Sequence, residues 1–261
     1  MTGHRLTRGA LAVSILACAL EFMAGGEDPA PAPVDLSGAW AELQVCSQMD
    51  VLPILGKVTS TSTSLLCATI EQSGSSLLMR EVTCSTTIKT GSALGKLVIP
   101  EAFLASLGEM TRPASLDGSG PTIRFDQPWY TQVRGAYLVD PENDALPTNP
   151  DDPRVFDQDG DGKPGLTVRV SILGFLSGEV YVVQRVRYRM VGTVVSPNRV
   201  EGLIEWSNEQ ITIEASNPLF AVDTQPEPNS APEKSYFVLQ RVDPGTACQR
   251  IVAQRKALFG R

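Results

Sequence analysis

Histidine is nearly absent from this sequence, since His4 is the only one among 261 residues. His4 lies in a segment that we expect to be removed after export, so the mature chain is expected to hold no imidazole. That absence excludes a Ser-His-Asp triad, a Cys-His dyad and zinc sites with histidine ligands. The sequence also lacks the G-x-S-x-G, S-x-x-K, phosphate-loop and dinucleotide-binding motifs. We therefore expect a protein that is not an enzyme.

Positive charge is scarce as well, with 22 lysines and arginines against 29 acidic residues and a net charge of −7. Nucleic-acid binding depends on clustered lysine and arginine, so we expect no nucleic-acid partner. The chain is 42% hydrophobic, which excludes a disordered or fibrous protein. Its length is sufficient for one domain with a sizeable core.

The first residues have the pattern of an export signal. Two arginines precede an apolar run that is too short to span a bilayer. Residues 15–18, ILAC, resemble a bacterial lipobox, which implies cleavage before Cys18 and a lipid anchor on its thiol. Ordinary cleavage after Ala19 is the alternative. We expect residues 1–17 to be a signal peptide, residues 18–33 a tether, and the protein to be exported. It is then either a lipoprotein of the outer membrane and cell surface or a periplasmic or extracellular protein.

Four further cysteines follow the leader, and an even number in an oxidising compartment predicts two disulfides. They have no metal-ligand spacing. Three pairings are open, and we favour the pairs Cys46–Cys67 and Cys84–Cys248. The second pair would connect the C-terminal segment to an early strand.

Alternation of polar and apolar residues dominates from residue 34 onward and predicts a β-rich domain over residues 34–261. A hairpin is expected across residues 72–76, which are rich in serine and glycine. Further strands are expected at residues 130–139, 166–173, 179–195 and 236–242. A short helix near residues 100–107, with proline in its first turn, and a C-terminal helix are the predicted helices.

One strand pair allows its register to be predicted. A tight turn around residues 196–198 places Arg189 opposite Glu205 and Tyr188 opposite Trp206. One face of this pair is then charged and complementary, and the other is aromatic and aliphatic. A second turn at residues 208–209 is expected to begin a third strand.

Roughly eight to ten strands in one sheet must close or fold over to hide their edges. The sequence therefore predicts an all-β fold, a single mostly antiparallel β-barrel, with a β-sandwich as the alternative. No repeat occurs at a fixed period, so we expect neither a propeller nor a solenoid.

Residues 36–40, LSGAW, resemble the G-x-W opening of lipocalins. Successive antiparallel strands followed by a C-terminal helix held by a disulfide are also similar to lipocalins. The resemblance implies an up-and-down barrel that carries a small apolar ligand, with Trp40 at the closed end. Trp40, Tyr188 and Trp206 are the candidate pocket residues. A plain core position for Trp40 is the alternative.

An acidic, proline-rich segment interrupts the strands at residues 140–165. Within it, Asp157, Asp159 and Asp161 alternate and a glycine follows. The pattern resembles the D-x-D-x-D-G calcium loop of EF-hands, dockerins and thrombospondin type-3 repeats. Alternate carboxylates on a tightly turned backbone converge, and Ca²⁺ prefers about six to eight oxygen ligands. We expect a Ca²⁺ site here. A Mg²⁺ site is less favoured, because Mg²⁺ takes fewer protein ligands and needs a stricter geometry.

We expect the backbone carbonyl of Lys163 to be a further ligand of that site. The remaining ligands are expected from water or from Asp140, Glu142, Asp151 or Asp152, of which we favour Asp152. The ninth and twelfth positions are Gly165 and Val168, so a full EF-hand is not expected. The alternative is a solvated loop whose aspartates and glycines make turns.

Three functions are consistent with these features. The first is a non-enzymatic, lipid-anchored envelope protein with a structural Ca²⁺ site, whose partners are the membrane and an envelope component. The second is a carrier of a small apolar ligand, and the third a hydrolase that uses carboxylates or calcium. A hollow barrel interior would favour the carrier, and a filled interior would favour the envelope protein. Two converging, desolvated acids in a cleft would favour the hydrolase.

Overall fold

The computed structural model describes residues 34–52, 54–118, 122–222 and 225–260. The expected signal peptide, Cys18 and the tether lie outside these residues. Among the residues that the structure describes, no helix has the length and apolar character needed to cross a membrane.

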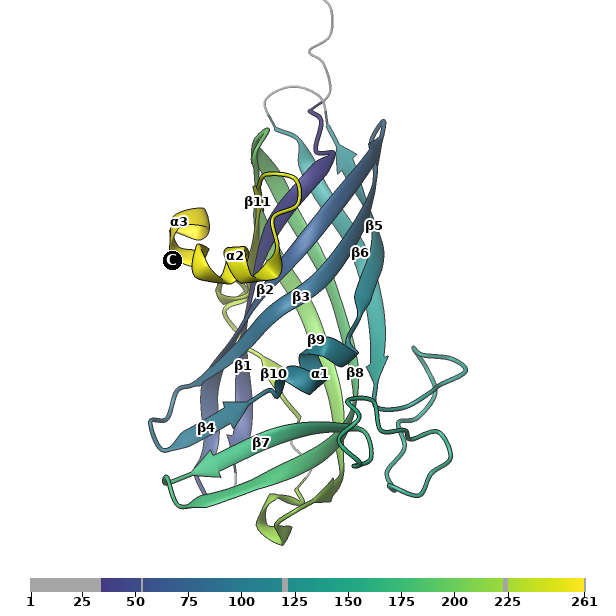
Figure 1. The fold of residues 1–261 in the computed structure, drawn as a ribbon, viewed down its shortest axis with the longest axis vertical. Coiled ribbons are helices and arrows are strands. Elements are labelled where there is room, and N and C mark those ends of the chain that lie inside the picture. Colours follow the sequence, from purple (N-terminus) through teal and green to yellow (C-terminus); the bar gives the residue numbers. More distant parts are fainter. Residues whose placement is uncertain (1–33, 53, 119–121, 223–224, 261) are drawn as a thin grey trace, which may run out of the picture. The chain divides into compact units, whose positions relative to one another are not determined.

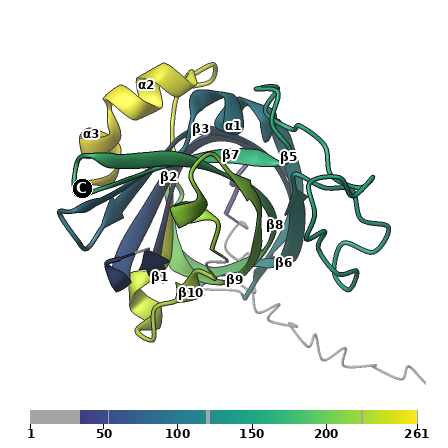
Figure 2. The ribbon, with the colours of Figure 1, turned by 90° about the horizontal axis from the view of Figure 1, so that it is seen from below.

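The described residues form one sheet of eleven strands, and eight of them close into a ring (Figure 2). The strands are β1 (Gly38–Leu52), β2 (Gly56–Ser73), β3 (Ser76–Thr90), β4 (Gly95–Val98), β5 (Glu109–Asp117), β6 (Arg124–Arg134), β7 (Leu166–Ile172), β8 (Leu176–Ser196), β9 (Arg199–Ala215), β10 (Glu227–Pro228) and β11 (Tyr236–Arg241). Around the ring the order is β8, β6, β5, β3, β2, β1, β11 and β9, and β9 pairs again with β8. The predicted all-β, mostly antiparallel barrel is confirmed.

Short helices lie at the ends and on the outside of this ring (Figure 1). They are α1 (Glu101–Ser106), η1 (Pro218–Phe220), η2 (Pro232–Lys234), α2 (Cys248–Ala253) and α3 (Arg255–Phe259). The predicted helix near residues 100–107 is confirmed. The single C-terminal helix that was predicted is instead two short helices, α2 and α3, separated at Gln254. Strands β7 and β4 extend the sheet beyond the ring, because the first half of β8 pairs with β7 and its second half with β6.

The predicted register of β8 and β9 is confirmed, with Arg189 opposite Glu205 and Tyr188 opposite Trp206. The second turn predicted at residues 208–209 is wrong, because β9 runs without interruption through Asn208. The polar side chains of Asn208 and Gln210 face the interior of the barrel, where they line a cavity. Alternation therefore continues through a stretch whose composition suggested a turn.

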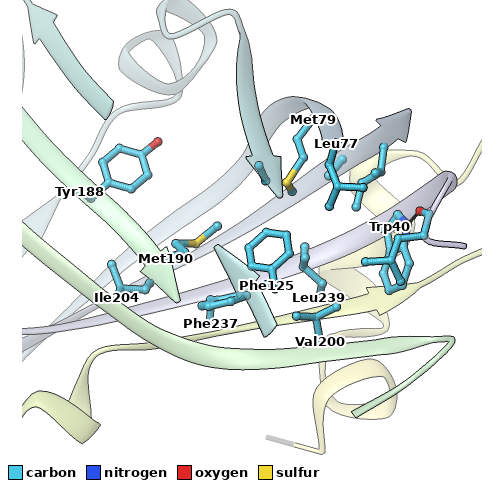
Figure 3. Close-up of a cluster of buried hydrophobic side chains, with 14 residues drawn as sticks. Trp40, Leu77, Met79, Phe125, Tyr188, Met190, Val200, Ile204, Phe237 and Leu239 are labelled. Atoms are coloured by element: carbon cyan, nitrogen blue, oxygen red, sulfur yellow. Dashed lines mark hydrogen bonds between the residues drawn. The ribbon is translucent and has the colours of Figure 1, made fainter. Parts of the chain in front are cut away.

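The end of the barrel where β1 begins is filled with apolar side chains (Figure 3). The rings of Phe125 and Phe237 lie 5.6 Å apart between their centroids. Gly192 and Gly202 face each other across β8 and β9, and a Cβ at Gly202 would lie 2.6 Å from the ring of Phe237. The two glycines thus make room for Phe237 in the core.

The C-terminal helices cover the outer face of β1 at its middle. Leu43 and Val45 point outward there and pack with Ile251 and Phe259 in one buried cluster. A disulfide joins Cys84 on β3 to Cys248 at the start of α2, as predicted.

The other predicted disulfide, Cys46–Cys67, is wrong, and both residues are free thiols. In the register of β1 and β2, Cys46 lies opposite Ser62 and Cys67 lies opposite Ala41. Positions 41 and 46 are five residues apart on one strand, so Cys46 and Cys67 face opposite sides of the sheet. Cys46 lines the interior cavity and Cys67 packs under the C-terminal helices.

Candidate functional site

The half of the barrel away from Trp40 encloses a cavity of about 280 Å³. This volume is near the lower limit for small-molecule sites. Its lining comes from every strand of the ring except β11, and from β4, β7, α1 and residues that follow β9. The interior thus has a filled part and a hollow part.

A buried ion pair lies at the boundary between these two parts. Arg112 on β5 donates from Nε to Glu81 Oε2 on β3 at 2.6 Å, and its Nη2 also pairs with this carboxylate. Their side chains are 1% and 0% exposed. The guanidinium of Arg112 lies 4.6 Å from the ring centroid of Tyr188, which lines the cavity. Two oppositely charged side chains therefore compensate each other inside the barrel.

A second acid, Glu42, lies beside this pair. Burial, followed by the charge of Glu81, raises the pKa of Glu42 to about 8, so this carboxyl holds a proton at neutral pH. Gln44 Nε2 lies 2.7 Å from Glu42 Oε1. Glu42 and Glu81 are desolvated and close, but neither lines the cavity. A hydrolytic role for this pair therefore gains no support from the cavity.

The outer end of the cavity is apolar. Helix α1 contributes Phe103 and Leu104, β7 contributes Val170, and the segment after β9 contributes Phe220 and Val222. That segment is held by two hydrogen bonds between Gln225 and the backbone of Gln210, at 3.1 and 2.6 Å. The lining therefore changes from polar near Gln44, Ser64 and Tyr188 to apolar at this end.

Burial shifts the pKa of two titratable groups of the lining, Cys46 and Asp50. Burial raises the pKa of the Cys46 thiol to about 12, so it is not a nucleophile at neutral pH. Burial also raises the pKa of Asp50, which accepts a hydrogen bond of 2.7 Å from Gln48 Nε2.

Two of the three predicted pocket residues, Tyr188 and Trp206, line the cavity. Trp40 does not, which corrects the prediction. It is 0% exposed in the filled end, its Nε1 donates to the carbonyl of Leu36 at 2.8 Å, and Arg241 lies 4.6 Å above its ring. The indole therefore lies in the apolar core, away from the hollow part.

The acidic segment carries the second candidate site. Ligand atoms of Asp157, Asp159 and Asp161 lie within 4.8 Å of one another. Asp157 accepts hydrogen bonds of 2.8 Å from the backbone N–H groups of Gly160 and Gly162. Thr167 donates its hydroxyl to Asp161 at 2.6 Å and its backbone N–H to Asp159 at 3.1 Å. The three carboxylates that the spacing predicted to converge do so.

Asp159 is the member of this cluster that has a buried carboxylate oxygen, Oδ1, without a hydrogen-bond partner among the described residues. Burial, opposed by the N–H of Thr167 and reinforced by the charges of Asp161 and Asp157, raises its pKa. A cation at this point would supply the missing partner and relieve the repulsion.

The expected fourth carboxylate does not join the cluster. Asp152 accepts hydrogen bonds from Arg154 at 2.8 and 3.0 Å, which lower its pKa to about 2. Among the described residues, the group of acids close enough to share a metal contains only the three alternating aspartates. Asp152 as a ligand is therefore wrong, because its neighbour two residues along already neutralises it. The carbonyl of Lys163 stays a prediction.

The acidic segment lies against the outside of the barrel (Figures 1 and 2). Gln158 accepts a hydrogen bond of 2.7 Å from the N–H of Gly135, and Arg185 on β8 donates to the carbonyls of Glu142 and Asp144. A metal ion bound here would therefore stabilise a surface loop and would not contact a ligand in the cavity.

Arg134 is a cavity residue that the sequence analysis missed. The signal was the alternation of Tyr130, Gln132 and Arg134 on one strand face, which places all three on the inner side of β6.

No family model, curated protein or solved structure matches this chain.

Proposed function

We propose that this protein is a non-enzymatic, exported binding protein that carries a small apolar ligand inside its barrel. The observation that supports the proposal is the cavity of about 280 Å³ with an apolar outer end. A barrel with only a structural role gains stability from a filled interior, because a void forfeits packing contacts. An apolar ligand would restore those contacts in the hollow half.

The sequence and the disulfide support the cellular part of this proposal. The leader pattern before Cys18 resembles that of an exported, lipid-anchored protein, and the Cys84–Cys248 disulfide is typical of an oxidising compartment. The G-x-W-like opening of β1 is in keeping with a lipocalin-like carrier. We infer attachment to a bacterial envelope membrane through Cys18, with the barrel held outside the cytoplasm.

A cavity-filling substitution tests ligand carriage. Thr86 lines the cavity, whereas its neighbour Thr87 is exposed on the other face of β3. Thr86→Phe should weaken binding of an apolar fluorescent dye such as Nile red about tenfold or more, since overpacking opposes occupancy by at least about 1.4 kcal/mol. Fluorescence titration measures this effect. Thr87→Phe is the matched control and should bind as the unsubstituted protein does; equal binding by both variants would contradict the proposal.

We further propose that Ca²⁺ binds the three alternating aspartates and stabilises the acidic segment. The convergence of Asp157, Asp159 and Asp161 and the unpartnered oxygen of Asp159 support this second role. The site is on the outer surface, so the ion is structural in this proposal.

A thermal melt with calcium tests the second role. An ion present at about a hundred times its dissociation constant adds about 2.7 kcal/mol to the stability. For a domain of this size, the corresponding rise in Tm is about 5–10 °C. Asp159→Ala should abolish the rise, whereas Asp151→Ala, at an exposed acid outside the cluster, should retain it. A Tm that does not change with calcium in the unsubstituted protein would overturn the site.

A further inference from the structure

Arg134 places a guanidinium in the wall of the cavity, at the end of β6. It lies opposite Gln184 of β8, and both residues line the cavity. Its Nε and Nη2 donate to the same oxygen, Gln132 Oε1, at 3.0 and 2.8 Å. A neutral amide oxygen is thus the hydrogen-bond partner of this cation, and Nη1 has none among the described residues.

No carboxylate of the described residues forms an ion pair with Arg134. The neighbouring arginine of the interior, Arg112, is by contrast matched to Glu81. Among the described residues that line the cavity, Asp50 is the one acid, and it lies on β1, across the ring from β6. Burial lowers the pKa of the Arg134 guanidinium, and the electrostatic effects of Tyr188 and Tyr130 act in the opposite direction. Arg134 is therefore an uncompensated positive charge beside an apolar space.

Tyr188 adds a second donor at the inner end of the same cavity. Its hydroxyl lies 3.9 Å from the sulfur of Met110, which is a weak acceptor. Burial raises the pKa of Tyr188, so the hydroxyl keeps its proton and can donate it in a stronger hydrogen bond. A guanidinium and a tyrosine hydroxyl together favour an acceptor with several oxygens and a negative charge.

We propose that the cavity takes an amphipathic anion, with a carboxylate or phosphate head on Arg134 and an apolar tail among Phe103, Val170 and Phe220. This inference rests on the proposed carriage of a small ligand and adds its chemical class. The charge of the head compensates Arg134 in a desolvated site, where an ion pair is strong when its hydrogen bonds are complete. The tail lies where the lining is apolar.

Calorimetric titration with three probes of equal chain length tests the inference: dodecanoate, dodecyl phosphate and 1-dodecanol. The unsubstituted full-length protein should bind the two anions more tightly than the alcohol by about tenfold or more, the usual size of a charge-assisted hydrogen bond. Arg134→Gln should lose about tenfold to a hundredfold of the affinity for dodecanoate. Its affinity for the alcohol should stay unchanged.

Two further variants separate charge from folding. Arg134→Lys keeps the positive charge and should retain the preference for the anions, and Arg187→Gln, on the outer face of β8, should bind all three probes normally. If the alcohol binds as tightly as the anions, the anionic head is overturned while ligand carriage stands. If none of the probes binds, carriage itself fails. Dodecanoate affinity that is unchanged in Arg134→Gln overturns the role of Arg134.

Discussion

Replacing Arg112 with methionine should lower the free energy of unfolding by about 3–5 kcal/mol, the cost of leaving a buried charge without its partner. Arg112 and Glu81 are 1% and 0% exposed, and Gln127 Nε2 lies 3.4 Å from the other oxygen of Glu81. Without the guanidinium, Glu81 must either take up a proton or stay charged in the interior, and both lower stability. Urea unfolding followed by tryptophan fluorescence measures the change.

Two controls distinguish this effect from lost packing. Arg80→Met removes the arginine of the pair Arg80–Glu71, whose side chains are 43% and 57% exposed, and should change the stability by at most about 1 kcal/mol. Adding Glu81→Leu to Arg112→Met should recover much of the loss, because an apolar pair of similar volume needs no charge compensation. A loss of the same size in Arg80→Met and Arg112→Met would contradict the interpretation.

Phe237→Ala is expected to cost about 3–5 kcal/mol, through lost transfer free energy and the cavity it creates. The ring is fully buried, and Gly192 and Gly202 leave no side chains of their own to fill its space. Differential scanning calorimetry or urea unfolding measures the loss. This substitution affects the filled end only, so the ligand cavity should survive in the folded fraction.

Phe175→Ala is the matched control, since Phe175 is 81% exposed at the turn between β7 and β8. Its removal should change the stability by no more than about 0.5 kcal/mol. If Phe175→Ala and Phe237→Ala had similar effects, the filled end would not be the main apolar core of the barrel.

Local signals were sufficient to predict much of the fold. A tight turn and complementary side chains fixed the register of β8 and β9, since one residue of slippage would move every apolar side chain to the wrong face. Proline before Glu101 marked the start of α1 correctly. The number of cysteines left three pairings open, and the Cys84–Cys248 pair was the favoured one that the structure contains.

The interior charges could not be predicted in the same way. Glu42, Glu81 and Arg112 lie at inward positions where alternation leads one to expect apolar residues, and their compensation depends on neighbours distant in sequence. The Cys46–Cys67 prediction was wrong because the two side chains lie on opposite sides of the sheet. Which side each one faces depends on the register of β1 and β2, which composition alone does not give. The aspartate triad, whose spacing is local, was predicted correctly as a cluster.

The filled end near Trp40 has a consequence for kinetics. Since side chains close that end, a ligand carried as proposed would enter and leave at the opposite end, where Phe103 and Phe220 line the cavity. Exit would then require these apolar side chains to shift. The residence time of a bound molecule would then depend on the rate of that movement as well as on equilibrium affinity.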